Sequence, residues 1–506
     1  MTFTLTWSDI FLAIVGFFVV KGLLKSKHNG SLPPGPKKLP LLGNLLDMPS
    51  EQQWLTFAEW GKKYGNILSV EVLGQHMVIL NSAQPAIALM DKRSATYSGR
   101  PMLTLAGDLI GWNRSLVLSQ NDSHFKEIRK NIYRVIGSRT SLVKYHSLIE
   151  HQCHRFLKRL VATPPNFADH IRWMAGAIIL AISHGYEVED ENDPYLETAD
   201  IAIHYFSITT AAGAYLVDLL PVLKYVPTWL PGTTFQTVAK LGSQSLTEMT
   251  DKPHEVVKNQ MADGSASRSF TSELLEGRNL NPAQEYVVKW SAQTLYSGGA
   301  DTTVAVNHSF FLAMTLFPDI QKKAQTEIDD VIGYNRLPTI ADRESLPYLS
   351  ALVLEVLRWF ALAPLGVAHV AMEDDVYEGF FIPKGTLIVP NIWQMLHDPS
   401  VYSDPMEFKP ERFVASEGHE PEQDPHNVCF GFGRRMCPGI VLAEASIFIQ
   451  CASTLAAFNI SKVSENGELV IPKAEQTTGT ISHPKPFKCS ITPRSTKALE
   501  LIRDEE

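Results

Sequence analysis

The feature that most constrains this chain is the decapeptide FGFGRRMCPG at residues 430–439. It places Cys437 in a loop of glycines and a proline, with two arginines before the cysteine and an apolar, helix-like run after it. Gly433 and Gly439 permit backbone turns that a side chain would oppose. The N-terminus of the following helix offers N–H groups and a positive dipole end to a thiolate. The loop therefore predicts a cysteine held as an anionic metal ligand; the alternative is a buried free cysteine beside a turn.

Cysteine usage and net charge narrow the class of protein. The chain has five cysteines, an odd number, and no CxxC pair or Cys–His cluster. A disulfide framework and a zinc site are therefore disfavoured, whereas a single-thiolate metal site in a reducing compartment stays open. The net charge of −9, without a basic patch interleaved with aromatic residues, argues against a nucleic-acid binder. With 506 residues and 45% hydrophobic composition, the chain can bury a large core.

Residues 1–28 resemble a membrane anchor. Residues 10–20 are uninterrupted apolar sequence, and Lys21 can extend its amine toward the interface. Positive charge follows the apolar run, at Lys25 and Lys27, and does not precede it, which disfavours a cleaved signal peptide. The positive-inside rule then places the N-terminus in a lumen and the rest of the chain in the cytosol. A buried core helix is the remaining alternative, because the run is short for a bilayer span.

A proline-rich stretch separates this segment from the rest of the chain. Residues 29–44 contain LPPGP and LPLLGN, in which prolines forbid helix and stiffen the chain, so we expect a rigid hinge. Residues 45–506 show no further linker, and we expect one large, mainly α-helical domain with a small β part. Helical periodicity prevails over residues 123–320, whereas residues 67–80 predict a hairpin and residues 376–389 predict short strands.

Residues 213–232 interrupt the helical region, because three prolines break helix there. The apolar side chains that we consider for exposure are Tyr215, Leu219, Leu220, Tyr225 and Trp229. Two interpretations are open. The stretch is a buried loop between helices, or it is an apolar lip that touches a membrane, since Trp and Tyr favour the interface.

Gly298 and Gly299 lie inside an otherwise helical, apolar run and precede Asp301 and Thr302. A glycine inside a helix costs about 1 kcal/mol relative to alanine, so we expect the pair to let another body approach closely. The Asp–Thr pair can open the helical ladder, and a hydroxyl beside a carboxylate can relay protons. The alternative is a kinked core helix whose polar pair is satisfied internally.

Glu355 and Arg358 are three residues apart, so on a helix they share one face. The residues around them are apolar, which predicts a buried ion pair that fixes geometry more than it stabilises. Arg412, in the sequence FKPERF, is a third candidate for this network. His369 lies in a short extended piece that follows the helix of Glu355 and Arg358. A lone histidine there can be structural or can contact a ligand.

Together these motifs resemble those of the cytochrome P-450 family, the haem-thiolate monooxygenases. The similarity covers nearly the whole chain, and four motifs occur in the family's order. They are the GGxDTT helix, ExxR, PERF and FxxGxRxCxG. The details are most similar to fungal microsomal enzymes of secondary metabolism. The resemblance implies a cytochrome P-450-like haem domain behind an N-terminal transmembrane anchor.

The resemblance also implies site roles. Cys437 is expected to be the axial thiolate of haem b iron. Asp301 and Thr302 are expected to deliver protons to dioxygen at the iron. Further cofactor contacts are expected from Phe430, Arg435, Arg129, His369 and Gly299. The network of Glu355, Arg358 and Arg412 is expected to hold the cysteine loop.

Two positions near these motifs need separate treatment. Phe125 stands where the family has a tryptophan that donates to a haem propionate, and phenylalanine has no donor. His124 and Lys126 are the candidates to compensate. Cys429 directly precedes Phe430, whereas the pattern puts the ligand seven residues after that phenylalanine, so Cys429 is excluded as the ligand.

By resemblance, the chain is expected to oxidise a lipophilic small molecule, a terpenoid or related intermediate, with dioxygen. Electrons are expected from NADPH through a separate flavoprotein reductase that docks around Arg434, since the chain has no dinucleotide fingerprint. The enzyme is expected in the endoplasmic reticulum membrane, with a single span and a cytosolic catalytic domain. The expected pocket walls are residues 104–118, 201–215, 293–303, 363–369 and 477–482. An amine substrate facing Asp108 is an alternative. So is a haem-thiolate isomerase or dehydratase, or a haem-binding sensor or carrier.

Overall fold

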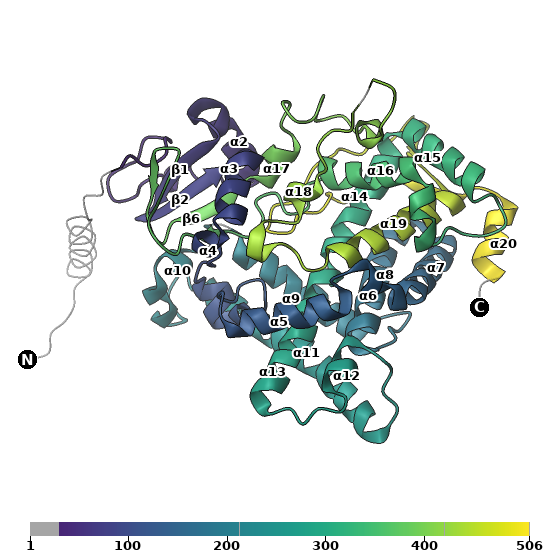
Figure 1. Cartoon of the computed structure of the whole chain (residues 1–506), viewed down its shortest axis with the longest axis horizontal. Helices are drawn as coiled ribbons and strands as arrows, with labels where there is room; N and C mark the ends of the chain where they lie inside the picture. Colours follow the sequence, from purple (N-terminus) through teal and green to yellow (C-terminus); the bar gives the residue numbers. More distant parts are fainter. Residues whose placement is uncertain (1–29, 212, 419, 505–506) are drawn as a thin grey trace, which may run out of the picture.

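The computed structural model describes residues 30–504 apart from residues 212 and 419. The predicted anchor at residues 1–28 therefore lies outside the described residues. In Figure 1, strands β1, β2 and β6 gather at one end of the molecule, and helices make up most of the remainder. The expectation of a mainly α-helical fold with a small β part is confirmed.

The helices of the described chain are α2 (Gln53–Tyr64), α3 (Ala83–Ala86), α4 (Ser94–Tyr97), α5 (Ser123–Ile136), α6 (Arg139–Leu142), α7 (His146–Ala162), α8 (Phe167–His184), α9 (Pro194–Thr210), α10 (Leu216–Leu219), α11 (Thr234–Asp263), α12 (Phe270–Leu275), α13 (Pro282–Ala300), α14 (Thr302–Leu316), α15 (Pro318–Val331), α16 (Pro347–Trp359), α17 (Ile392–Leu396), α18 (His426–Cys429), α19 (Ile440–Ala457) and α20 (Thr496–Asp504). The short 3-10 or π elements include η3 (Thr104–Ile110), η7 (Pro221–Tyr225), η9 (Pro410–Phe413) and η10 (Gly433–Arg435).

The strands are β1 (Ile67–Val72), β2 (Gln75–Leu80), β3 (His369–Val370), β4 (Asp375–Tyr377), β5 (Phe380–Ile382), β6 (Leu387–Pro390), β7 (Phe458–Ser461), β8 (Ser464–Glu465), β9 (Glu468–Leu469) and β10 (Ser490–Pro493). The largest sheet has the order β1-β2-β6-β3. The predicted hairpin is confirmed, because β1 and β2 pair antiparallel with Ile67 opposite Leu80. Strand β6 joins β2 in parallel and so connects the two ends of the sequence within one sheet.

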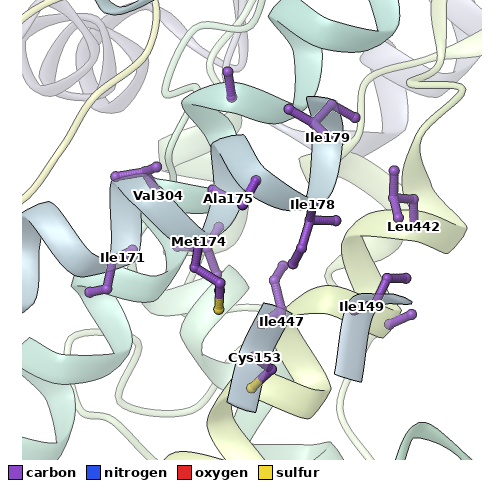
Figure 2. Close-up of a cluster of buried hydrophobic side chains, with 14 of the residues drawn as sticks. Ile149, Cys153, Ile171, Met174, Ala175, Ile178, Ile179, Val304, Leu442 and Ile447 are labelled. Carbon is purple, nitrogen blue, oxygen red and sulfur yellow. The ribbon is translucent and has the colours of Figure 1, made fainter. Parts of the chain in front are cut away.

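The core lies where α7, α8, α14 and α19 meet, as Figure 2 shows. The labelled side chains there are Ile149 and Cys153 of α7, Ile171, Met174, Ala175, Ile178 and Ile179 of α8, Val304 of α14, and Leu442 and Ile447 of α19. Within the described residues, α19 is the helix that is long and apolar enough to cross a membrane, and 72% of it is buried. Because α19 directly follows the cysteine loop, this core holds the loop's C-terminal end in place.

The helical run that contains the glycine pair is broken at Asp301. Helix α13 ends at Ala300, Asp301 has φ −128° and ψ −32°, and α14 begins at Thr302. The Thr302 hydroxyl donates to the carbonyl of Gly298 at 2.7 Å, a bond that competes with the backbone ladder. The expectation that the Asp–Thr pair opens this ladder is confirmed.

Part of the predicted hinge packs on the sheet. The backbone N–H of Ser69 donates to Pro34 O at 2.8 Å, and its hydroxyl donates to Pro33 O at 2.6 Å. A side chain at Gly35 would collide with the carbonyl of Ser69. Residues 33–35 are therefore fixed against β1, while the hinge role of residues 29–44 and the domain boundary at residue 45 stay predictions.

The described residues of the 213–232 stretch are only partly buried. Val222, Tyr225 and Trp229 are 69%, 77% and 78% exposed. Tyr215, Leu219 and Leu220, which were also considered for exposure, are half-buried, and Tyr215 packs against the core. The tip of the stretch agrees with the lip interpretation and not with a buried loop.

Candidate functional site

An internal cavity of about 350 Å³ lies between the α13–α14 break and the cysteine loop. All five expected wall segments contribute to it. Representative lining residues, one from each segment, are Trp112, Phe206, Gly298, Val367 and Thr480. Helix α8 adds Ile179 and helix α16 adds Leu357, which the sequence analysis did not anticipate. An open hollow on the outer surface, beside Leu109 and α11, contains none of the candidate site residues.

The cysteine loop is held by its own backbone. Cys437 N donates to Phe430 O at 2.9 Å, which closes the loop around η10. Gly431 and Gly433 have φ of 78° and 52°, and a side chain at Gly433 would collide with backbone packed against it. Gly439, in contrast, has φ −93°, so the expectation that it makes a turn only glycine can adopt is wrong.

The Cys437 thiol faces the cavity and lies deep beneath the protein surface. The accessible surface of Cys437 therefore faces the cavity and not the outside of the protein. Burial raises the pKa of Cys437, while the Gly439 backbone N–H and the charge of Arg129 lower it to a smaller extent. That Cys437 is held as an anionic metal ligand therefore stays a prediction. A thiolate here needs a cation such as a metal ion, whose binding displaces the thiol proton.

Three arginines line the cavity edge beside the cysteine loop. Arg435 Nε donates to Ser98 O at 2.9 Å, and its Nη2 has no hydrogen-bond partner. Arg129 Nη1 donates to Met436 O at 2.8 Å. Arg100 is buried, and burial together with the charge of Arg435 lowers its pKa well below the usual value. In the described part of the chain, no carboxylate pairs with any of the three arginines.

Arg100 is the site residue that sequence reasoning missed. Its Nε donates to Val117 O at 2.8 Å and its Nη1 to Ala368 O at 2.9 Å, so backbone carbonyls fix its guanidinium at the cavity edge. His369, which was expected here, lies nearby with Nδ1 2.7 Å from Tyr97 O. Burial and the charge of Arg100 lower the pKa of His369 well below its usual value, so its imidazole is neutral. In the sequence, Arg100 stands between a glycine and a proline, and no motif or spacing distinguishes it from other arginines.

Phe125 occupies the corner expected to need compensation. Asp122 caps α5 by accepting from Phe125 N at 2.9 Å, and the Phe125 ring lies 4.1 Å from the guanidinium carbon of Arg435. Lys126 is exposed, and His124 bonds to the Arg114 carbonyl at 2.8 Å instead of lining the cavity. The expectation that either one compensates is wrong, because both side chains leave the cavity edge.

These features fit haem. The site offers one thiol in an apolar wall and buried guanidiniums that have no carboxylate of the described chain to neutralise them. An iron that takes a thiolate, in a macrocycle with two carboxylates, supplies both missing charges. Phe430 also lines this wall and stacks on His426, with ring centroids 5.2 Å apart.

The Glu–Arg network forms, but not at the cysteine loop. Arg358 donates from Nε and Nη2 to the Glu355 carboxylate at 2.7 and 2.9 Å, and Arg412 Nε lies 3.1 Å from it. Arg358 and Arg412 also donate to carbonyls between residues 396 and 407. Among the described residues, none of the network's hydrogen bonds reaches residues 430–439. The network therefore fixes the segment that leads to the loop.

Gly298 and Gly299 have different surroundings. A side chain at Gly298 would meet nothing within 4 Å, because Gly298 opens on the cavity. A side chain at Gly299 would lie 2.7 Å from Ile179, so Gly299 allows α8 to approach α13 closely. Gly299 thus allows the close approach that was expected, here of helix α8, whereas Gly298 leaves space open in the cavity.

Asp301 and Thr302 point in different directions. Thr302 lines the cavity, whereas Asp301 is buried and pairs with Arg172 and His483, at 3.1 and 3.0 Å. Asp108 does not line the cavity either; its carboxylate is 3.9 Å from Lys224 on the surface. An amine that faces Asp108 inside the pocket is therefore ruled out by the geometry.

Comparison with known proteins gives a consistent result. A family model described as Cytochrome P450 matches residues 33–491. Cytochrome P450 monooxygenase 208 of Postia placenta is 48% identical and covers 98% of this chain and 96% of its own length. Cytochrome P450 monooxygenase claR of Ampulloclitocybe clavipes is 48% identical, with 98% and 93% covered, and ppsD of Aspergillus oryzae is 42% identical, with 98% and 95% covered. These names state an activity and no substrate.

Proposed function

The chain belongs to the cytochrome P450 family of monooxygenases, and we propose that it inserts one oxygen atom of dioxygen into a lipophilic small molecule of fungal secondary metabolism. Members of this family use haem b with a cysteine thiolate ligand and receive electrons from a reductase. The observation that carries the proposal is the position of Cys437 across the cavity from the α13–α14 break. Bound haem supplies the iron at which dioxygen is activated.

Different residues of this chain would contact different parts of the haem. Cys437 is the proposed iron ligand, and Phe430 packs beside it on the same wall. Arg100, Arg435 and His369 form the proposed propionate corner, because their polar atoms converge at the cavity edge without a carboxylate from the described chain. The two arginines bring the positive charge. The neutral His369 donates its Nδ1 proton to Tyr97 O, so it borders the corner without donating to a carboxylate. A haem bound there would lower the cost of burying two like charges so close together.

Thr302 is the proposed hydroxyl on the oxygen side of the cavity. Its own proton is donated to Gly298 O at 2.7 Å, so its oxygen lone pairs remain available to a donor in the cavity. The hydroxyl therefore orients a water or a reacting group by accepting a hydrogen bond. Asp301 is the proposed proton source, and it reaches the cavity only when its present ion pairs open.

The cavity wall favours an apolar, uncharged substrate. On the substrate side it presents Ile179, Ile203, Phe206, Val306 and Ile481, with hydroxyls but no carboxylate among the lining residues. An ammonium group would lose its hydration there without gaining a counter-ion. A terpenoid or related hydrocarbon-rich intermediate satisfies this wall better than an amine.

We place the enzyme on the endoplasmic reticulum membrane, held by a single span at residues 1–28, with the catalytic domain in the cytosol. The exposed tip of the 213–232 stretch supports a second contact, since Tyr225 and Trp229 suit the membrane interface. In Figure 1, α10 at the start of this stretch lies at the same end of the molecule as the β1–β2 hairpin, close to where the described chain begins. A flavoprotein reductase carrying NADPH-derived electrons would dock around the exposed Arg434.

The carbon monoxide spectrum of the reduced protein tests the proposal. Wild type is expected to show the red-shifted Soret band of thiolate ligation, and Cys437→Ala is expected to lose it. Cys429→Ala is the matched control, because that cysteine also lines the cavity and should leave the band unchanged. A band that survives Cys437→Ala would sink the proposal. Reductase-driven consumption of dioxygen then separates a monooxygenase from an isomerase, a dehydratase or a carrier.

A further inference from the structure

Asp301 is enclosed by partners that hold it as an anion. Its Oδ1 lies 3.1 Å from Arg172 Nη1 and its Oδ2 lies 3.0 Å from His483 Nε2. Burial alone would raise the pKa of Asp301, but the hydrogen bonds and charges of His483 and Arg172 lower it below the usual value. A carboxylate in this state accepts protons and has none to give. Each proton that it passes on must first reach it from a neighbour.

The neighbours differ in whether they can supply that proton. Arg172 is shared with Asp200, 2.8 Å away, and these carboxylates keep its pKa raised despite its burial, so it stays protonated. His308 has its ring 6.2 Å from that of His483, but burial lowers its pKa to about 4 and its Nε2 lies 3.3 Å from Ala168 O. Neither residue is suited to exchange protons near neutral pH. His483 is the remaining titratable group in contact with Asp301 among the described residues.

His483 also lies at the boundary between solvent and the buried carboxylate. Its side chain is 19% exposed, against 10% for Asp301. Its backbone is fixed by two hydrogen bonds with Thr477, each 2.9 Å long, so the imidazole is held in place on a short, tied segment. The same segment carries Thr480 and Ile481, which line the cavity. One rigid piece of chain therefore connects solvent, Asp301 and the wall of the active site.

We infer that His483 is the relay residue through which Asp301 regains protons from solvent in each catalytic cycle. This rests on the proposed function, in which one dioxygen, two electrons and two protons convert a substrate C–H into C–OH and water. Water gives a proton to His483 Nδ1, and Nε2 gives its proton to the Asp301 carboxylate. Exchange with water then resets the imidazole tautomer. Arg172 acts as the counter-charge that returns Asp301 to its ionised form.

The test compares His483→Gln with His151→Gln in the full-length haem-loaded enzyme with its reductase. Glutamine keeps an N–H donor for Asp301 but cannot pass a proton, and His151 is an exposed histidine on α7. We expect His483→Gln to lower product formed per NADPH by about ten-fold. This is less than the ~100-fold typical of a lost acid–base group, because water can still reach Asp301. The solvent isotope effect on product formation should rise in the same variant, which a purely structural role would not cause.

A second measurement follows chemical modification of the histidines in the wild-type protein. Diethyl pyrocarbonate should modify His483 in the folded holoenzyme and leave the buried His308 protected, as read by peptide mass spectrometry. Loss of coupling should follow the modification of His483 in time, and His483→Gln should be insensitive to the reagent. This arm stands even if the glutamine variant folds poorly.

The outcomes separate this inference from the proposed function. Unchanged coupling and isotope effect in His483→Gln, while Thr302→Ala uncouples the enzyme, would overturn the relay and leave the monooxygenase intact. Protection of His483 from the reagent would overturn it too. If no variant changes coupling because no dioxygen is consumed at all, the proposed function itself fails.

Discussion

Removal of the Glu355 carboxylate is expected to destabilise the protein far more than removal of any surface ion pair. Glu355 and Arg358 have fully buried side chains, and Arg412 is 2% exposed. The carboxylate accepts from both guanidiniums and from Lys409 N at 2.7 Å. In Glu355→Ala these donors lose their acceptor inside the protein, where water cannot replace it.

The magnitude follows from the burial. Breaking a buried ion pair by removing one partner costs about 3–5 kcal/mol, because the remaining charge stays uncompensated. The matched control is Lys323→Gln, which removes a pair of similar length, 2.6 Å to Glu411, whose lysine side chain is 61% exposed. A surface pair of that kind contributes about 0–1 kcal/mol. Glu355→Gln keeps the shape and one acceptor and should fall between the two.

The assay is urea unfolding of the holoenzyme, followed by circular dichroism and by the Soret band in parallel. Limited proteolysis of residues 396–407 adds a local reading, because Arg358 and Arg412 tie down that segment through its carbonyls. The Soret signal and the cleavage rate should both change in Glu355→Ala and stay constant in Lys323→Gln. A Glu355→Ala loss below about 1 kcal/mol, equal to that of the control, would refute the argument from burial.

Three other predictions concern packing, pH and the membrane. Gly299→Ala should destabilise the fold by about 1–3 kcal/mol, because the added methyl group overpacks against α8. Gly298→Ala has open space around it, so it should be neutral or stabilising by up to about 1 kcal/mol while it narrows the cavity. Equal unfolding midpoints for the two variants would contradict this prediction. Burial is outweighed at both partners of the His426–Glu444 pair. Hydrogen bonds and charge from Asp424 and Glu444 raise the pKa of His426 to about 9, and those from His426 and Arg343 lower the pKa of Glu444 to about 2. The stability that Glu444 contributes is complete above its unfolded pKa and is lost toward pH 2. The stability that His426 contributes is complete below pH ~6.5 and is lost as the pH rises through 9. The thermal unfolding temperature should therefore be highest near pH 5–6.5, and its decrease at alkaline pH should be smaller in His426→Phe. Deletion of residues 1–28 should release most of the protein from microsomes, and full retention would place the main membrane contact elsewhere.

Much of the fold followed from local patterns. The hairpin of β1 and β2 was predictable because alternating apolar residues flank a glycine turn, and the helices because apolar spacing repeats with their period. The 213–232 lip stayed ambiguous because its three prolines prevent a long helix but do not show which side chains meet solvent. Gly439 was misjudged for a related reason: a glycine in a motif does not reveal its φ.

The sequence by itself determined the chemistry of this protein. Cys437 is the cysteine with the full FxxGxRxCxG context, and that context singles it out from Cys429 without coordinates. The wall segments were expected from the family resemblance that these motifs carry, and residues from all five segments line the cavity. The motifs themselves consist of residues that are close together in the chain, so their spacing can be recognised without coordinates.

Only the tertiary structure decided how charge is arranged around that chemistry. Asp301 meets Arg172 across 129 positions and His483 across 182, and Arg100 reaches the Arg435 corner from the other end of the sequence. No period or motif encodes such pairs, because which ionisable groups share a buried volume depends on how helices pack. The pKa of each group, and the route open to a proton, depend in turn on that shared burial.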